Sequence, residues 1–354
     1  MLKQYKPTLD KLTKIVGKSH VLIDEQDTRH YRQGIRFGEG KVLAVVCPGT
    51  LLEQWQALQT IIEADCVVIM QAANTGLTGG STPYGDEYDR PVIIMSTRRL
   101  QGIQVILDGK QVVCLPGATL DNLERTLKPY NREPHSVIGS SCIGASVLGG
   151  VCNNSGGALV RRGPAYTEMA LYARVNESGE LELINHLGID LGNTAEEILT
   201  RLQKQDYETG QVTTQTTQLA SDNRYAHDVK QVDADSPARF NADPTRLYEA
   251  SGSAGKVCVF AVRLDTFEKV ESKVFYIGSN DHDDLTAIRR YLLTSLPSLP
   301  IAGEYIHRDA FSIGAKYGKD TFLFIERFGT VNIPRALALK DRIDGWLEKI
   351  KIRG

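Results

Sequence analysis

Two long glycine-rich stretches constrain the fold of this chain more than any other feature. The first glycine stretch, residues 71–81, follows the apolar β-type run 66–70 and reads Gln-Ala-Ala-Asn-Thr-Gly-Leu-Thr-Gly-Gly-Ser. The second glycine stretch, residues 138–157, holds six glycines. Small side chains let the backbone approach a ligand closely and present its N–H groups to an anion such as a phosphate. One such loop fits a plain tight turn equally well, but two favour backbone wrapped around a large ligand.

The glycine spacing excludes two common nucleotide-binding motifs. Gly76, Gly79 and Gly80 do not fit the G-x-G-x-x-G pattern of a Rossmann dinucleotide site, and the chain has no P-loop motif. The ligand that these stretches favour therefore requires a different fold.

The residues before the first glycine stretch predict a βαβ-like unit. An apolar strand at 42–48 ends in proline, and Thr50 and Glu53 form a capping box. Apolar residues then recur at helical spacing over 51–63, and the strand 66–70 follows. This order places the first glycine stretch at the carboxyl end of a strand, where open α/β sheets bind ligands.

The rest of the chain predicts a mixture of helices and strands. Residues 8–36 predict a helical lead-in, and 205–235 predict a long polar surface excursion. The further predicted strands are 92–95, 103–107, 111–115, 169–175, 181–185 and 256–264, with hairpin turns at Asp108-Gly109 and 177–179. The further predicted helices are 119–127, 194–203, 283–293 and 335–351. Apolar runs at 274–277 and 321–325 indicate a separate α+β element after residue 266.

Composition narrows the class of protein. The 354 residues allow two or three domains, and a net charge of −2 argues against a general nucleic-acid binder. No run of about 20 strongly apolar residues is long enough to span a membrane. The six cysteines have no C-x-x-C spacing, which favours buried, reduced thiols and a cytoplasmic protein, and no His/Cys/Asp cluster has the spacing of metal ligands.

Four segments together resemble a known family. Residues 72–81, 132–147, 152–160 and 162–168 are similar to the quinone-dependent D-lactate dehydrogenases, and the resemblance extends from about residue 10 to residue 354. These proteins have the flavin domain of the p-cresol methylhydroxylase and vanillyl-alcohol oxidase type. The resemblance therefore implies an α+β fold with a two-subdomain FAD-binding domain, followed by the start of an α+β cap domain.

The resemblance also implies how the chain is divided. The FAD-binding domain would span residues 1–265, with its core at 38–209. The cap would start at 266–306, and the start of a membrane-contact region would occupy 307–354. Relatives are much longer, so we expect this chain to be a truncated version that lacks their closing elements.

The same resemblance implies FAD bound without a covalent link. Carried over position by position, the flavin contacts fall on Ala72, Ala73, Asn74, Thr75, Gly76, Gly80, Ser81, Gly139, Ser146, Gly156 and Val259. The first glycine stretch would hold the pyrophosphate, and the second would flank the ribityl chain and the ring. Val259 lies in an apolar run, so a plain core valine is an equal alternative.

The implied activity is FAD-dependent oxidation of D-lactate to pyruvate, with electrons passed to membrane quinone. The partners would be D-lactate, quinone and the anionic surface of the inner membrane, with peripheral association on its cytoplasmic side. Two alternatives remain: a flavoprotein dehydrogenase for another D-2-hydroxy acid, and a non-catalytic FAD-binding fragment.

The sequence assigns no catalytic residue. Histidine is the usual base near neutral pH, and His135 beside the second glycine stretch and His307 in the group Tyr305-Ile306-His307-Arg308 are the candidates. His186 follows a strand and is expected to cap a turn. In relatives, a histidine motif in the second half competes for the role of the base.

Overall fold

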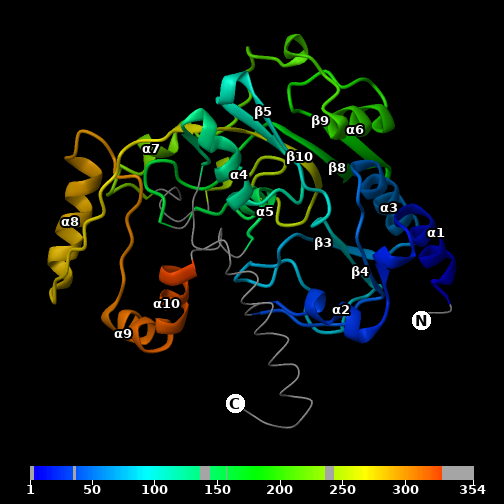
Figure 1. Cartoon of the computed structure of the whole chain (residues 1–354), viewed down its shortest axis with the longest axis horizontal. Helices are drawn as coiled ribbons and strands as arrows, with labels where there is room; N and C mark the ends of the chain where they lie inside the picture. The colour runs from blue at the N-terminus through cyan, green and yellow to red at the C-terminus, as the bar shows by residue number, and fades with distance from the viewer. Residues whose placement is uncertain (1–3, 35–36, 136–143, 157, 236–242, 329–354) are drawn as a thin grey trace, which may run out of the picture.

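The computed structural model describes residues 4–34, 37–135, 144–156, 158–235 and 243–328. Two β-sheets with flanking helices form the body of the molecule (Figure 1). The four-stranded sheet has the order β1 (Val21–Leu22), β2 (Ala44–Val46), β4 (Val92–Ser96), β3 (Val67–Gln71). Strands β2 and β3 both run parallel to β4, and β1 pairs antiparallel with β2. The predicted βαβ-like unit is present, with β4 inserted between its two strands.

Helix α3 (Leu51–Glu63) has the predicted bounds because its N-terminus is capped as the sequence indicates. The Thr50 side chain accepts a hydrogen bond from the Glu53 N–H at 3.1 Å. The Glu53 carboxylate accepts from the Gly49 N–H at 2.6 Å, so the Thr50 half of the predicted capping box forms while Glu53 bonds the residue before the cap. The predicted helical lead-in comprises α1 (Lys6–Val16), which packs on α3, and α2 (Glu25–Arg32).

The second sheet has five strands and is antiparallel throughout. Its order is β5 (Ile103–Ile106), β6 (Gln111–Cys114), β10 (Cys258–Asp265), β8 (Ala170–Val175), β9 (Leu181–Asn185). Both predicted hairpins are confirmed, and Asp108 and Gly179 take the positive φ that such turns favour. One face of this sheet carries α4 (Leu120–Leu127) and α5 (Val147–Cys152), and the other contacts α3 and α6 (Ala195–Lys204).

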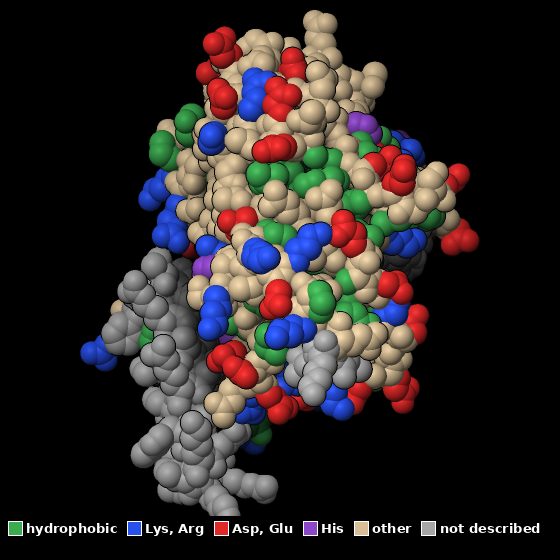
Figure 2. Space-filling model, turned by 90° about the vertical axis from the view of Figure 1, so that its right-hand side faces the viewer, with side chains coloured by type: hydrophobic (Ala, Val, Ile, Leu, Met, Phe, Trp, Pro, Cys, Tyr) green, Lys and Arg blue, Asp and Glu red, His purple; other side chains and the backbone are tan. Residues whose placement is uncertain are grey.

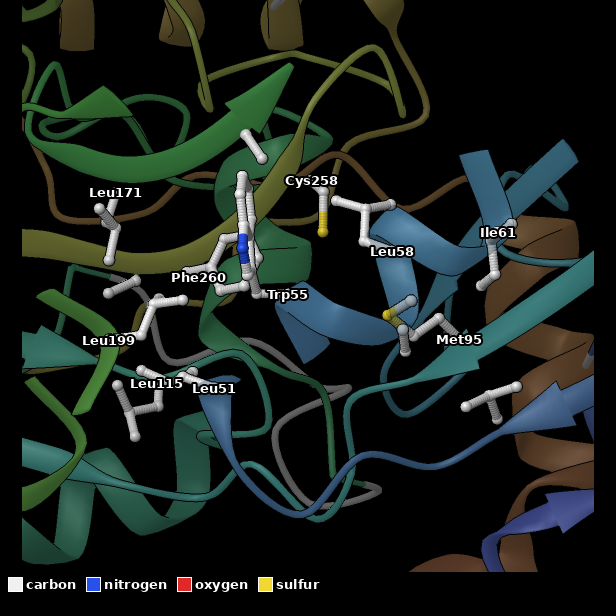
Figure 3. Packing of buried hydrophobic residues seen from close by; sticks show 14 of the residues in the cluster. Leu51, Trp55, Leu58, Ile61, Met95, Leu115, Leu171, Leu199, Cys258 and Phe260 are labelled. Carbon is white, nitrogen blue, oxygen red and sulfur yellow. The ribbon is translucent and has the colours of Figure 1, made fainter. Parts of the chain in front are cut away.

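The two sheets share one core, and α3 lies between them. Leu51, Trp55 and Leu58 of α3 pack against residues of both sheets (Figure 3). The rings of Trp55 and Phe260 lie 6.2 Å apart between centroids, and Met95 of β4 belongs to the same cluster. Burial of these apolar side chains fixes the two subdomains against each other.

The predicted polar excursion at 205–235 is confirmed as mostly irregular chain. It contains only the short helix α7 (Tyr225–Asp228) and a 3₁₀ turn, η5 (Thr209–Gln211). Elsewhere among the described residues, the 3₁₀ turns include η1 (Lys18–His20), η2 (Leu107–Gly109), η3 (Lys128–Tyr130) and η7 (Pro244–Arg246).

The chain after β10 differs from the expected α+β element. Strand β11 (Phe267–Glu268) pairs with β7 (Arg132–Glu133). Three helices follow on the opposite side of the molecule from α1 and α3 (Figure 1): α8 (His282–Thr294), α9 (Arg308–Tyr317) and α10 (Lys319–Phe328). The sequence assigns no helix or strand to the apolar run 321–325, because short apolar runs fit both equally, and the structure places it within α10. The run 274–277 is exposed and forms no ladder. The predicted helix 335–351 lies outside the described residues.

Surface charge is mixed on the face that Figure 2 shows. Basic and acidic side chains alternate there, without an extended area of one sign. Within the described ranges, no helix is long and apolar enough to cross a membrane. The same residues contain no group of three or more His, Cys, Asp or Glu side chains that could hold a metal ion.

Candidate functional site

The first glycine stretch begins where β3 ends, and Gln71 holds its two ends together. The buried Gln71 amide donates to the Ser81 carbonyl at 2.7 Å and to the Tyr31 carbonyl at 2.8 Å. One side chain therefore closes the stretch on itself and attaches it to the end of α2. The location at the carboxyl end of a parallel strand is the one that the sequence predicts.

Asn74 fixes the middle of the same stretch. It has a φ of +55°, a conformation that asparagine tolerates better than most residues. Its side-chain amide donates to the Gln33 carbonyl at 2.7 Å, and its oxygen accepts from the Ser81 hydroxyl at 2.9 Å. Ala72, Ala73 and Thr75 are half-buried beside it. The backbone is thus held in shape by side chains of the protein itself.

The glycines of this stretch leave open space for a ligand. A Cβ added to Gly76 or Gly80 would meet no atom within 4 Å, and neither residue has a positive φ. Gly79 differs, because it has a φ of +74° and its Cβ position lies 3.1 Å from the Phe37 carbonyl oxygen. The tight-turn explanation therefore applies to Gly79, whereas Gly76 and Gly80 fit a cradle that a bound group would fill.

The second glycine stretch is described from Gly144 to Gly156, and Gly139 lies outside the described residues. Ser146 caps α5, since its hydroxyl accepts from the Gly149 N–H at 3.0 Å. Gly156 is buried, and its carbonyl accepts from the Leu159 N–H at 3.0 Å. Both residues therefore lie in segments whose backbone is held by hydrogen bonds.

Thr97, just after β4, connects the two glycine stretches. Its N–H donates to the Gln71 carbonyl at 2.8 Å, and its hydroxyl reaches the Pro116 carbonyl at 3.2 Å. Two residues further on, the Ala118 carbonyl accepts from the Val147 N–H at 2.9 Å. The start of the first stretch is thus bonded to one end of the segment 97–119, and the start of α5 is bonded to the other end.

Val259 lies in β10 where the two sheets meet. It is buried, at a β-bulge, and its carbonyl accepts from the Gln54 amide at 3.2 Å. The Gln54 side-chain oxygen is buried and has no hydrogen-bond partner among the described residues. Next to Val259, the Cys258 thiol lies 3.7 Å from Met70 of β3. The start of the first glycine stretch and Val259 therefore lie beside one junction of the two sheets, and the open space at Gly76 and Gly80 fits a bound polar ligand.

His135 is buried next to the second glycine stretch. Its Nε2 lies 3.4 Å from the Arg162 carbonyl oxygen, and its Nδ1 has no hydrogen-bond partner among the described residues. Burial, with a smaller effect of the Arg162 charge, lowers the pKa of His135 to about 4, so the ring is neutral at pH 7. It borders a cavity of about 20 Å³ together with Val147 and Gly150. That volume suits a single water rather than a substrate.

The second histidine candidate caps a helix. His307 precedes α9, and its Nδ1 accepts from the Asp309 N–H at 3.1 Å. The Tyr305 ring stacks edge-on at 6.5 Å, and both side chains are exposed. His186 does not cap its turn as expected; it pairs with Glu249 at 2.6 Å.

The sequence did not reveal four residues that position the glycine stretches: Gln54, Gln71, Thr97 and Arg162. For Gln71, the missed feature is the bond of its side chain to Ser81. Their partners lie far away in sequence: Thr97 and Gln71 are 26 residues apart, and Gln54 and Val259 are 205 apart. No local pattern reports such a contact.

Two segments of the chain match known families. Residues 42–182 match the family described as FAD binding domain, so the chain carries an FAD-binding domain. Residues 274–354 match the family described as D-lactate dehydrogenase, membrane binding. A solved structure of alkyldihydroxyacetonephosphate synthase superimposes with a TM-score of 0.50 at 13% identity, over 75% of this chain and 42% of that one. The α+β fold with a two-subdomain FAD-binding domain is thereby confirmed.

Curated relatives match almost the whole chain. The quinone-dependent D-lactate dehydrogenase of Haemophilus influenzae is 60% identical over 337 residues, which cover 95% of this chain and 60% of that protein. The protein of the same name from Escherichia coli is 56% identical, over 98% of this chain and 61% of its own length. The chain is similar over nearly its whole length to quinone-dependent D-lactate dehydrogenases, and it spans about three-fifths of the length of these relatives.

Proposed function

We propose that this chain binds FAD without a covalent bond and is the flavin-binding part of an enzyme that oxidises D-lactate to pyruvate. Electrons would pass from the flavin to membrane quinone. The observation that carries this proposal is the identity of 56–60%, over nearly the whole chain, to proteins named quinone-dependent D-lactate dehydrogenase.

The chain's own residues would bind and orient the cofactor. The half-buried residues Ala72–Thr75 and the open Gly76 would present N–H groups to the pyrophosphate, with Gly80 and Ser81 closing the cradle. Ser146, Gly156 and the undescribed Gly139 would flank the ribityl chain and ring, and Val259 would contact the cofactor from β10. FAD, when bound, supplies the acceptor for the hydride of lactate.

Membrane association would be peripheral, on the cytoplasmic side of the inner membrane. The membrane-binding match begins at residue 274, where a run of large apolar side chains is exposed, including Phe275 at 79% and Tyr276 at 92%. Six basic and three acidic residues after 334 would add attraction to anionic lipid. The net charge of −2 argues against nucleic acid as a partner.

A non-catalytic FAD-binding fragment is the alternative from a different class of function. The matches cover 60–61% of the length of these relatives. A dehydrogenase for another D-2-hydroxy acid is the alternative within enzymes. The base and the cation for the substrate carboxylate are not assigned to any of the described residues.

Turnover separates these functions. The purified chain, loaded with FAD, is assayed with D-lactate and a quinone analogue, beside a chain extended to the length of the relatives. We expect FAD uptake by both and D-lactate oxidation by the longer chain alone, since loss of positioning can cost about 7–11 kcal/mol of barrier. If the longer chain binds FAD but oxidises another D-2-hydroxy acid in place of D-lactate, the substrate assignment is wrong. Acid precipitation that leaves flavin attached to protein would contradict non-covalent binding.

A further inference from the structure

One side chain joins the two segments that flank the second glycine stretch. The Arg162 guanidinium donates from Nη1 to the carbonyls of Pro134 at 3.0 Å and His135 at 3.2 Å. Its Nη2 pairs with the Glu133 carboxylate at 2.5 Å. In the reverse direction, His135 Nε2 lies 3.4 Å from the Arg162 carbonyl. Residues 133–135 lead into the stretch and Arg162 follows it, so these contacts close a loop.

The same guanidinium is fixed from its other side. Its central carbon lies 4.0 Å from the ring centroid of Phe267, and its side chain is only 9% exposed. Phe267 pairs with Glu133 between β11 and β7, so the ring and the carboxylate belong to one small sheet. Arg132 strengthens that sheet by donating to the Thr266 carbonyl at 2.6 Å. Arg162 is therefore held in a rigid frame.

Arginine suits this position for reasons that lysine does not share. Its planar fork can donate to several acceptors at once and stack on an aromatic face. Ordering a long loop costs conformational entropy, and a loop that is already closed loses less of it when a ligand binds. The contacts of Arg162 with residues 133–135 are therefore expected to affect ligand affinity as well as the stability of the fold.

We propose that Arg162 is a positioning residue for FAD, which fixes the residues that flank the second glycine stretch and thereby raises the affinity of the chain for the cofactor. This inference rests on the proposed function of the stretch. Arg162 acts through the backbone of residues 134–135 and through Phe267, and the proposal gives it no contact with the cofactor. A role in stability alone would leave FAD affinity unchanged once the chain is folded.

The test compares Arg162→Gln and Arg162→Lys with a matched control, Arg161→Gln. Arg161 is the adjacent arginine, and it donates twice to the Leu299 carbonyl, at 3.1 and 2.8 Å, outside the glycine stretch. FAD affinity is measured by quenching of flavin fluorescence, at a temperature well below unfolding for every variant. Thermal unfolding without FAD reports stability separately.

We expect Arg162→Gln to weaken FAD binding by about tenfold or more, and Arg162→Lys to lie between it and the parent, with Arg161→Gln close to the parent. If folded Arg162→Gln binds FAD as the parent does, the inference is overturned, even if its unfolding temperature falls. Should Arg162→Gln not fold, Arg162→Lys decides, and a parent-like affinity rejects the inference. Failure of the parent itself to bind FAD rejects the proposed function instead.

Discussion

The Cys258 thiol lies 3.7 Å from the Met70 sulfur, and this contact joins the two sheets next to the start of the first glycine stretch. Met70 is the next-to-last residue of β3, directly before the first glycine stretch, and Cys258 opens β10. Burial raises the pKa of Cys258 to about 12, against a smaller effect of the Gln54 hydrogen bond, so the thiol stays protonated at pH 7. The junction is therefore an uncharged, packed contact.

Substituting Gly76 tests the cradle without disturbing the fold. A Cβ there meets no atom within 4 Å and no positive φ has to be adopted, so Gly76→Val leaves the free energy of unfolding nearly unchanged. A bound pyrophosphate would collide with the new side chain, and we expect FAD affinity to fall by about tenfold or more. Fluorescence titration with FAD measures it. Parent-like FAD affinity would show that this loop is not the pyrophosphate site.

Gly79→Val is the control, and it acts in the opposite way. Gly79 has a φ of +74°, and its Cβ position lies 3.1 Å from a carbonyl oxygen. A valine there therefore strains the folded chain even without FAD. We expect a loss of about 1–3 kcal/mol in the free energy of unfolding, measured with urea in the absence of FAD. Equal stability of the two variants would refute the distinction between these glycines.

His135 makes stability depend on pH. Burial lowers its pKa from 6.5 to about 4, so between these values the unfolded chain binds a proton that the folded chain does not. Stability from this group is complete above pH 6.5 and is lost as the pH falls toward 4. Between pH 7 and pH 5 we expect the parent to lose about 2 kcal/mol more than His135→Gln in urea unfolding.

The control for this prediction is the same comparison between pH 9 and pH 8, where His135 is neutral in both the folded and the unfolded chain. If His135→Gln loses as much stability as the parent between pH 7 and pH 5, the buried histidine does not govern this dependence.

Buried thiols should be unreactive in the folded chain. Burial raises the pKa of each described cysteine, to about 11 for Cys152 and about 12 for Cys114 and Cys258. In a Cys142→Ser variant, which removes the one cysteine outside the described residues, we expect slow reaction with an aromatic disulfide at pH 8 and complete reaction after unfolding. A thiol that reacts in the native variant as fast as free cysteine would contradict this.

Salt should weaken membrane binding if lipid headgroup charge contributes as proposed. Attraction between surface charges is screened beyond about 8 Å at physiological ionic strength. We expect the chain to sediment with anionic vesicles at low salt and to be released at high salt, with neutral vesicles as the control. Retention through high salt and an alkaline wash would point to apolar insertion instead.

The sequence predicted the elements whose signals are local. Helix α3 has the expected bounds because Thr50 and Glu53 cap it, and both hairpins follow from their turn residues. The run 321–325 was ambiguous because three or four apolar residues fit either period, and its neighbours extend it as a helix.

The sequence predicted which stretches form the candidate site, but it did not predict the tertiary contacts that hold them in place. Glycines and small residues marked both stretches, yet the position of β4 between β2 and β3 and the clasp of Gln71 on Ser81 depend on tertiary contacts. The role of Arg162 is of the same kind, because its partners lie 27 to 105 residues from it and carry no pattern that points back to it.

Titration of the purified chain with FAD and, separately, with NAD decides which cofactor this chain binds. We expect uptake of FAD, seen as quenching of its fluorescence and a stoichiometric flavin absorbance after gel filtration, and no binding of NAD. Tight binding of NAD together with no uptake of FAD would contradict this expectation.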